Sequence, residues 1–181
     1  MTERSVVERL QERRLTLLPL ASRQRITERS VVERLQGVAA ALLVFLIAYS
    51  AVAWRLESAP DLFSDEILYT RAGIRVATAG ALIWDDGDPL FVHPPLYFLA
   101  EAAYLRLTTD PSSVARTPGD IFGWVFHARH LNAIFAGLTA VLLYWLGRRL
   151  HGLWLGILLV ALFFVDPFGV RTNRRAMLET L

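Results

Sequence analysis

Three long runs of apolar residues constrain the fold of this chain more than any other feature of its sequence. They cover residues 38–54, 131–147 and 153–170, and polar segments separate them. A helix rises about 1.5 Å per residue, so each run reaches the lower limit for crossing a bilayer. Apolar residues make up 54% of the chain, and their grouping into blocks favours a membrane protein over a soluble globule. The sequence predicts an all-α integral membrane protein with three transmembrane helices, at about residues 38–56, 129–147 and 153–170.

The distribution of charge predicts how these helices are oriented. Residues 1–36 contain eight arginines and five acidic residues, whereas residues 57–127 contain four arginines and ten acidic residues. A second basic segment, residues 148–152 (RRLHG), separates the second apolar run from the third. Arginines near a span are enriched on the cytoplasmic side. We therefore expect a multi-pass protein of the cell membrane, with a cytoplasmic N-terminus and a long outer loop at residues 57–127.

The polar segment 1–36 precedes a membrane module at residues 37–181 and contains one ten-residue sequence twice. TERSVVERLQ occupies residues 2–11 and again residues 27–36. Each copy matches a capping box that starts a short helix, with Ser30 opening the second one. A helix on the membrane surface is one interpretation, and a recent duplication or misplaced start is the one we favour. A signal peptide ending near residues 51–53 (AVA) is a further alternative.

The outer loop contains two more candidate helices. The first is predicted at residues 65–79, with Ser64 as its N-cap and Gly80 as its end. The second is predicted at residues 96–107, after Pro94-Pro95, and is too short to span a membrane. We expect both to lie at the membrane interface and residues 108–120 to form a loop.

The adjacent acids Asp65 and Glu66 are the strongest candidates for chemistry. Carboxylates beside a membrane are costly and usually functional. One of the two could act as a general base or bind a metal ion. The alternative is that both only stabilise the positive end of a helix.

Several arginines expected on the outer side are candidates for binding an anion. Arg71 and Arg75 are four residues apart on the first loop helix, where an anion would relieve the repulsion between them. Arg171, Arg175 and Glu179, also spaced by four, would form one stripe of a helix. At Arg71 and Arg75 a phosphate is one candidate, and a solvated surface is the commoner case. At Arg171 and Arg175 an anionic lipid phosphate would suit the arginines, and a surface pair between Arg175 and Glu179 is the alternative.

Composition excludes some classes of function and leaves the metal unknown. The net charge of +2 gives no support to nucleic-acid binding, and without cysteine the chain has no disulfide or thiolate nucleophile. The acidic segment 85–88 (DDGD) is best explained as a turn around glycine. His127 and His130 are half of a metal site without an evident third ligand. A divalent cation is therefore only a candidate cofactor.

The order of these motifs resembles the N-terminal part of the GT-C membrane glycosyltransferases. Within that family it is similar to the protein O-mannosyltransferases and the bacterial aminoarabinose transferases. An outward first span is followed by Asp65-Glu66, by residues 93–97 (HPPLY), by residues 129–152 (beginning RHLNAIF), and by Arg175-Ala-Met-Leu-Glu179. The resemblance covers residues 38–181, and the ordered set carries it.

The resemblance implies transfer of a hexose or pentose from a polyprenyl-phosphate donor to an acceptor hydroxyl at the outer membrane face. Asp65, with Glu66 beside it, matches the position of the catalytic acid and would take the proton of the acceptor. Charged residues would bind the lipid phosphate and the substrates. The matching positions are His93, Arg129, Arg175 and Glu179. Arg71 and Arg75 are further candidates, from their spacing alone.

Two departures from the family bear on this hypothesis. Glu179 stands where the family usually has aspartate, and the family carries many more spans than three. We therefore expect an N-terminal portion that is inactive alone. The main alternative is a non-catalytic scaffold or accessory subunit with a partner chain, or a decayed enzyme. A transporter fragment is disfavoured, because no charged residue interrupts the middle of a span.

Overall fold

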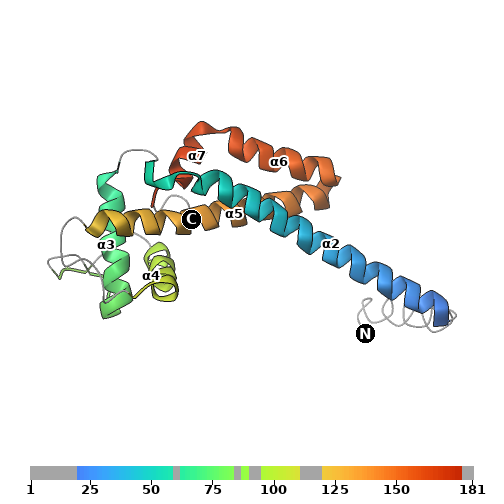
Figure 1. Cartoon of the computed structure of the whole chain (residues 1–181), viewed down its shortest axis with the longest axis horizontal. Coiled ribbons are helices and arrows are strands. Elements are labelled where there is room, and N and C mark those ends of the chain that lie inside the picture. Colours follow the sequence, from blue (N-terminus) through green and yellow to red (C-terminus); the bar gives the residue numbers. More distant parts are fainter. Residues whose placement is uncertain (1–19, 59–61, 84–86, 90–94, 111–119, 177–181) are drawn as a thin grey trace, which may run out of the picture. The chain divides into compact units, whose positions relative to one another are not determined.

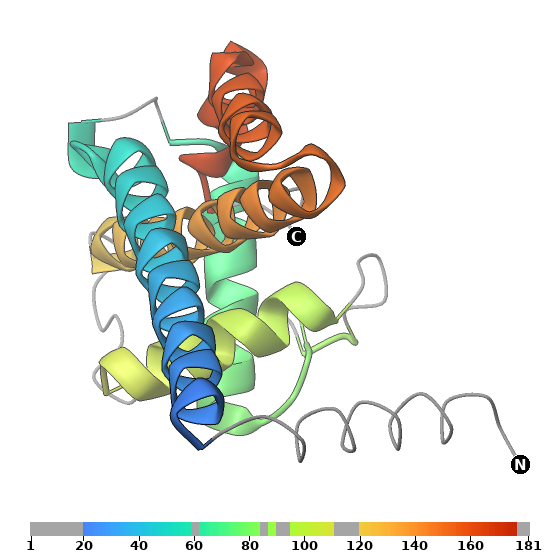
Figure 2. The same cartoon turned by 90° about the vertical axis from the view of Figure 1, so that its right-hand side faces the viewer.

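A computed structural model describes residues 20–58, 62–83, 87–89, 95–110 and 120–176 (Figures 1 and 2). The chain divides into two compact units, Met1–Ala41 and Leu42–Leu181. Within the described residues all named secondary-structure elements are helices. An isolated antiparallel β-bridge joins Ile83 to Pro89. The elements are α2 (Leu20–Ala53), η1 (Leu56–Ser58), α3 (Ser64–Ala79), α4 (Leu96–Thr108), α5 (Asp120–His151), α6 (Leu153–Val165) and α7 (Pro167–Asn173). The predicted all-α class is confirmed.

Helix α2 continues without a break from the polar segment into the first apolar run. Its part Val31–Ala53 is long and apolar enough to cross a membrane. Ser30 lies inside α2, so the prediction that it opens a helix is wrong. No proline or glycine lies between Leu20 and Gln36, so nothing in this stretch stops a helix from continuing. The first copy of the repeat lies outside the described residues.

Helix α5 is the second helix that is long and apolar enough to cross a membrane. It begins at Asp120, nine residues before the predicted start of the span at residue 129. Its 32 residues correspond to about 48 Å, whereas the hydrocarbon core of a bilayer is about 30 Å thick. The helix can therefore extend by several turns beyond the apolar core, and its first turns carry polar side chains.

The third predicted span, residues 153–170, is broken in the structure. Helix α6 has 13 residues, about 20 Å, and α7 leaves it at an angle of 78°. The break falls at Asp166-Pro167, because proline cannot continue the hydrogen-bond pattern of α6. The Asp166 carboxylate accepts the N–H groups of Phe168 (3.1 Å) and Gly169 (3.0 Å) and so starts α7. The described chain thus has two candidate spans, or three if the bent pair counts as one.

Helices α5 and α6 form a hairpin in which two glycines bring the backbones into contact. Gly152 makes the turn with a φ of 86°. A Cβ atom added to Gly147 would lie 2.6 Å from both the Cα and the N atom of Gly156. A Cβ atom on Gly156 would lie 2.7 Å from the carbonyl oxygen of Tyr144. Small residues at such crossings let helices pack closely within a membrane.

Helices α3 and α4 follow the two predicted loop helices closely. Helix α3 begins at Ser64 rather than Asp65, and its N-cap is Phe63, so the prediction of Ser64 as the N-cap is wrong. Gly80 ends α3 with a φ of 70°, as predicted. Helix α4 covers Leu96–Thr108 with Pro95 as its N-cap. Their location at the membrane interface stays a prediction.

The contact between α3 and α4 combines aromatic packing with a side-chain-to-backbone hydrogen bond and a buried carboxyl group. Tyr69 packs edge-to-face against Phe98, with ring centroids 5.7 Å apart. Arg106 donates from Nε to the carbonyl oxygen of Ala77 (2.7 Å), near the end of α3. Glu101 is fully buried against Gly73, and its two carboxyl oxygens have no hydrogen-bond partner among the described residues. This burial raises the pKa of Glu101 to about 8.

The close contact between Gly147 and Gly156 predicts that a methyl group added at Gly147 lowers the stability of the fold. We expect Gly147→Ala to destabilise the protein by about 1–3 kcal/mol, because its Cβ would meet the backbone of α6. The matched control is Gly123→Ala in the same helix, where a Cβ meets nothing within 4 Å. That control should stabilise by about 0.5–1 kcal/mol through its higher helix propensity. Thermal unfolding followed by circular dichroism in detergent would measure both, and equal effects would contradict the packing.

The buried carboxyl of Glu101 predicts a pH dependence of stability. Its pKa is about 8 in the fold against 4.5 when exposed, so the folded protein binds more protons between these values. Stability should therefore fall as the pH rises from about 4.5 to about 8, by an amount on the order of a few kcal/mol. Glu101→Gln should remove most of this slope, and Asp120→Asn, which changes an exposed acid, should retain it. A wild-type protein equally stable at pH 5 and pH 8 would contradict the assignment.

Candidate functional site

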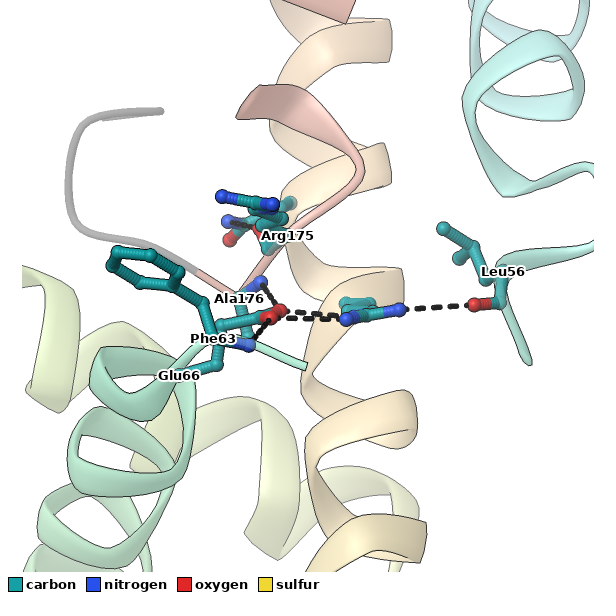
Figure 3. Close-up of polar contacts among 7 residues, drawn as sticks. Leu56, Phe63, Glu66, Arg175 and Ala176 are labelled. Carbon is teal, nitrogen blue, oxygen red and sulfur yellow. Dashed lines mark hydrogen bonds and ion pairs between the residues drawn. The ribbon is translucent and has the colours of Figure 1, made fainter. Parts of the chain in front are cut away.

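A buried ion pair between Glu66 and Arg129 joins α3 to α5. Both side chains have 0% exposure. Arg129 donates from Nε to Oε1 of Glu66 and from Nη2 to Oε2, both at 2.9 Å (Figure 3). This two-point contact matches the planar guanidinium to the planar carboxylate and is the strongest form of such a pair.

The Glu66 carboxylate also accepts two backbone N–H groups. The N–H of Phe63 donates to Oε2 at 3.0 Å, and the N–H of Ala176 donates to Oε1 at 2.8 Å. The first bond is the backward-reaching half of a capping box, since Glu66 is the third residue of α3. The second bond brings the chain that follows α7 onto the start of α3. Figure 3 shows both backbone groups converging on the carboxylate.

The third nitrogen of Arg129 reaches the chain that follows α2. Its Nη1 donates to the carbonyl oxygen of Leu56 at 3.1 Å. Arg174 binds the same short segment, donating from Nη2 to the carbonyl oxygen of Trp54 at 2.6 Å. We call the pair Glu66–Arg129, with the bonds to Leu56, Phe63 and Ala176, the Glu66 clamp. It joins the chain after α2, the start of α3, helix α5 and the chain after α7.

Asp65 lies in a different environment from its neighbour Glu66. Successive residues of a helix point about 100° apart, so burial of Glu66 against α5 turns Asp65 away from that contact. Asp65 is half-buried and accepts a hydrogen bond from the Ser64 hydroxyl at 3.2 Å. The two predicted catalytic acids therefore divide into a buried, fully paired carboxylate and an accessible one. Catalytic roles for either stay predictions.

Arg175 lies next to the start of α3. Its guanidinium is 5.1 Å from the centre of the Phe63 ring (Figure 3). Its carbonyl oxygen accepts a hydrogen bond from the side chain of Asn132. Its Nε is buried and has no hydrogen-bond partner among the described residues. Arg175 and Asp65 are thus brought to the same end of α3 through Phe63, which directly precedes Ser64.

The predicted stripe of Arg171, Arg175 and Glu179 on one helix is wrong. Helix α7 ends at Asn173, and Arg175 lies beyond it. The bond from the Ala176 N–H to Glu66 holds this part of the chain in a different direction. Glu179 and His93 lie outside the described residues, so their predicted roles stay untested.

The other predicted site residues lie apart from the clamp. Arg71 is exposed and Arg75 half-buried on α3, each with interactions of its own. His127 contacts the Thr108 hydroxyl through Nε2 (2.8 Å), and the ring of Tyr104 stacks on it. His130 contacts the Tyr49 hydroxyl through Nδ1 (3.0 Å). In the part of the chain that the structure describes, no three His, Asp or Glu residues come together to hold a metal ion.

Sequence reasoning missed the backbone partners of the clamp. The carbonyl oxygen of Leu56 and the N–H of Ala176 carry no signal in residue type, because every residue other than proline has both groups. It also missed Arg174 and Asn132, which bind the backbone of Trp54 and Arg175. A conspicuous signal did exist for Asn132, a polar residue directly after the start of an apolar run.

Comparison of the chain with protein families, with curated protein sequences and with solved structures found no match in any of the three.

The clamp predicts strong coupling between its two charged residues. We expect Glu66→Ala and Arg129→Ala each to destabilise the protein by about 3–5 kcal/mol, because each leaves a buried charge without its partner. The double variant should cost clearly less than the sum of the two. Arg149→Ala, an exposed arginine in the same helix, is the control and should cost less than about 0.5 kcal/mol. Unfolding of the four proteins in detergent would give the free energies for this double-mutant cycle. If the losses of stability in the two single variants simply added up in the double variant, the clamp would be contradicted.

Proposed function

We propose that this chain is the N-terminal module of a membrane glycosyltransferase that uses a polyprenyl-phosphate-linked sugar as its donor. The observation that supports the proposal best is the accessible Asp65 beside the Glu66 clamp. Asp65 is in the first turn of α3, and Arg175 lies against the ring of Phe63, the residue that precedes this helix. The described residues also include two helices that are long and apolar enough to cross a membrane. The resemblance in motif order supports the same reaction.

In the proposed reaction Asp65 is the general base. Its carboxylate takes the proton of an acceptor hydroxyl while that oxygen forms a bond to the anomeric carbon of the sugar. The bond from the anomeric carbon to the donor phosphate breaks, and the phosphate leaves with the electron pair. A guanidinium that meets the growing negative charge lowers the barrier. We assign this role to Arg175, whose half-buried guanidinium lies against the ring of Phe63 at the start of α3.

Glu66 and Arg129 act on the reaction through position in this proposal. Their charges neutralise each other, and three Arg129 nitrogens already bind protein groups. Their contribution is to hold the start of α3 and the chain after α7 together, which keeps Arg175 against Phe63 at the start of the helix that carries Asp65. An arginine bound in this way is poorly placed to take a phosphate oxygen as well.

Replacing Asp65 tests the proposal. We expect Asp65→Asn, introduced into the gene in its native host, to lower sugar transfer at least about 100-fold, because a general base contributes roughly 10²–10⁴-fold. Transfer would be measured in isolated membranes supplied with polyprenyl-phosphate mannose or polyprenyl-phosphate aminoarabinose. The control is Asp88→Asn, which changes an exposed acid elsewhere in the loop.

Full transfer activity in the Asp65→Asn membranes, with the protein present at its normal amount, would contradict the general-base role. Absence of transfer from both donors in wild-type membranes would favour a non-catalytic scaffold, in which the clamp serves only the fold.

A further inference from the structure

A cavity of about 380 Å³ lies beside the end of α2, within the second compact unit. Its volume falls in the range of small-molecule sites, about 300–1,000 Å³. None of the five residues that line it belongs to α3 or to the chain after α7, so the cavity is separate from Asp65 and Arg175. The lining residues are Ala53, Arg55, Leu56, Glu57 and His130.

The polar side chains of this cavity carry both signs of charge. Arg55 and Glu57 are exposed and two residues apart, and His130 faces them from α5. A guanidinium and an imidazole suit the oxygen atoms of a phosphate. A carboxylate suits a group with N–H donors, such as an ammonium. A ligand that carries a phosphate next to an ammonium would therefore match the charges of all three.

A hydrogen bond from α2 determines which nitrogen of His130 stays available. The Tyr49 hydroxyl lies 3.0 Å from Nδ1, so that nitrogen is already occupied. When the hydroxyl donates to Nδ1, the proton of the neutral ring is on Nε2. His130 then offers one N–H donor to a ligand oxygen even without carrying a charge.

The backbone of residues 54–56, beside the cavity, is strained at Arg55 and is held by hydrogen bonds from two arginines. Arg55 has a φ of 53°, a left-handed conformation that costs a non-glycine residue about 1–2 kcal/mol. Arginines bind the carbonyl oxygens on both sides of it, Arg174 at Trp54 (2.6 Å) and Arg129 at Leu56 (3.1 Å). Strain of this kind persists where surrounding contacts enforce it, and it is concentrated at ligand sites.

The cavity lies where apolar and polar parts of the chain meet. Trp54 is 71% exposed at the end of the first apolar helix, as is typical of aromatic residues at the membrane interface. His130 directly precedes the apolar part of α5. A ligand bound here could place its headgroup among the charged residues while its acyl chains follow the exposed apolar face of α2, which includes Leu42, Leu46 and Ile47.

We propose that this cavity binds the phosphoethanolamine headgroup of a membrane lipid, with the phosphate at Arg55 and His130 and the ammonium at Glu57. Such a lipid would occupy the space between the end of α2 and α5. None of the three residues that would bind the headgroup takes part in the proposed sugar transfer.

Native mass spectrometry of the detergent-solubilised chain, titrated with three lipids, tests the proposal. We expect phosphatidylethanolamine to bind roughly five- to tenfold more tightly than phosphatidylcholine or phosphatidylglycerol, because only its ammonium has N–H groups for Glu57. Glu57→Gln should reduce this preference to less than about twofold, since the charge-assisted bond is lost. Arg55→Gln should weaken the binding of all three lipids to the same extent.

The controls separate the outcomes. Asp120→Asn and Arg149→Gln change exposed charges elsewhere on α5 and should leave the preference unchanged. A preference that survives in Glu57→Gln, or its absence from the wild-type protein, would overturn the proposal. Soluble phosphoethanolamine that binds as tightly as the lipid would overturn the lipid assignment. Asp65→Asn should retain lipid binding, so this result does not depend on sugar transfer.

Discussion

The buried pair of Glu66 and Arg129 is the contact on which the rest of the second unit depends. Two charges with no exposure to water are stable only if each is matched in charge and in hydrogen bonds. Here the matching groups come from four places in the sequence: the chain after α2, the start of α3, helix α5 and the chain after α7. These four segments must therefore be assembled together, because the loss of any one leaves a buried polar group unpaired. The hydrogen bonds of the pair also have fixed directions, which apolar packing lacks.

The same pair determines which groups remain available for chemistry. Asp65 and Glu66 are adjacent in sequence, yet a helix turns them about 100° apart. Once Glu66 is bound to Arg129 of α5, Asp65 is left half-buried at the helix start. The bond from the Ala176 N–H holds the neighbouring Arg175 against the ring of Phe63, the residue that precedes α3. A structural ion pair and an accessible acid are thus two results of one helix geometry, which is why neighbouring acids can have different roles.

The sequence predicted those parts of the fold that depend on local signals. Apolar runs predicted α2 and α5, Gly80 predicted the end of α3, and prolines predicted the start of α4. Predictions from the sequence were wrong where distant contacts or competing local signals determine where a helix begins or ends. Ser64 is a better N-cap by residue type than Phe63, but Glu66 reaches back to the Phe63 N–H and moves the helix start. Asp166-Pro167 breaks the third run, a local signal that the apolar composition around it concealed. In the candidate site, charge and position identified Asp65, Glu66 and Arg129, whereas their pairing required the backbone of Leu56 and Ala176, which no residue type reveals.

Residues 54–56 connect the clamp with the cavity next to it. Their carbonyl oxygens would repel a bound phosphate if they faced the cavity, but Arg129 and Arg174 bind those of Leu56 and Trp54. The arginines thereby hold Arg55 in its left-handed conformation, in which its side chain lines the cavity wall. Arg129 thus stabilises two surfaces at once, since one of its nitrogens binds the cavity wall and the other two bind Glu66. A lipid in the cavity would favour the backbone conformation to which Arg129 binds, and through Arg129 the position of α3. Occupancy of the cavity and the placement of Asp65 are therefore expected to be coupled, with a free energy limited by the difference in lipid affinity between the two backbone conformations.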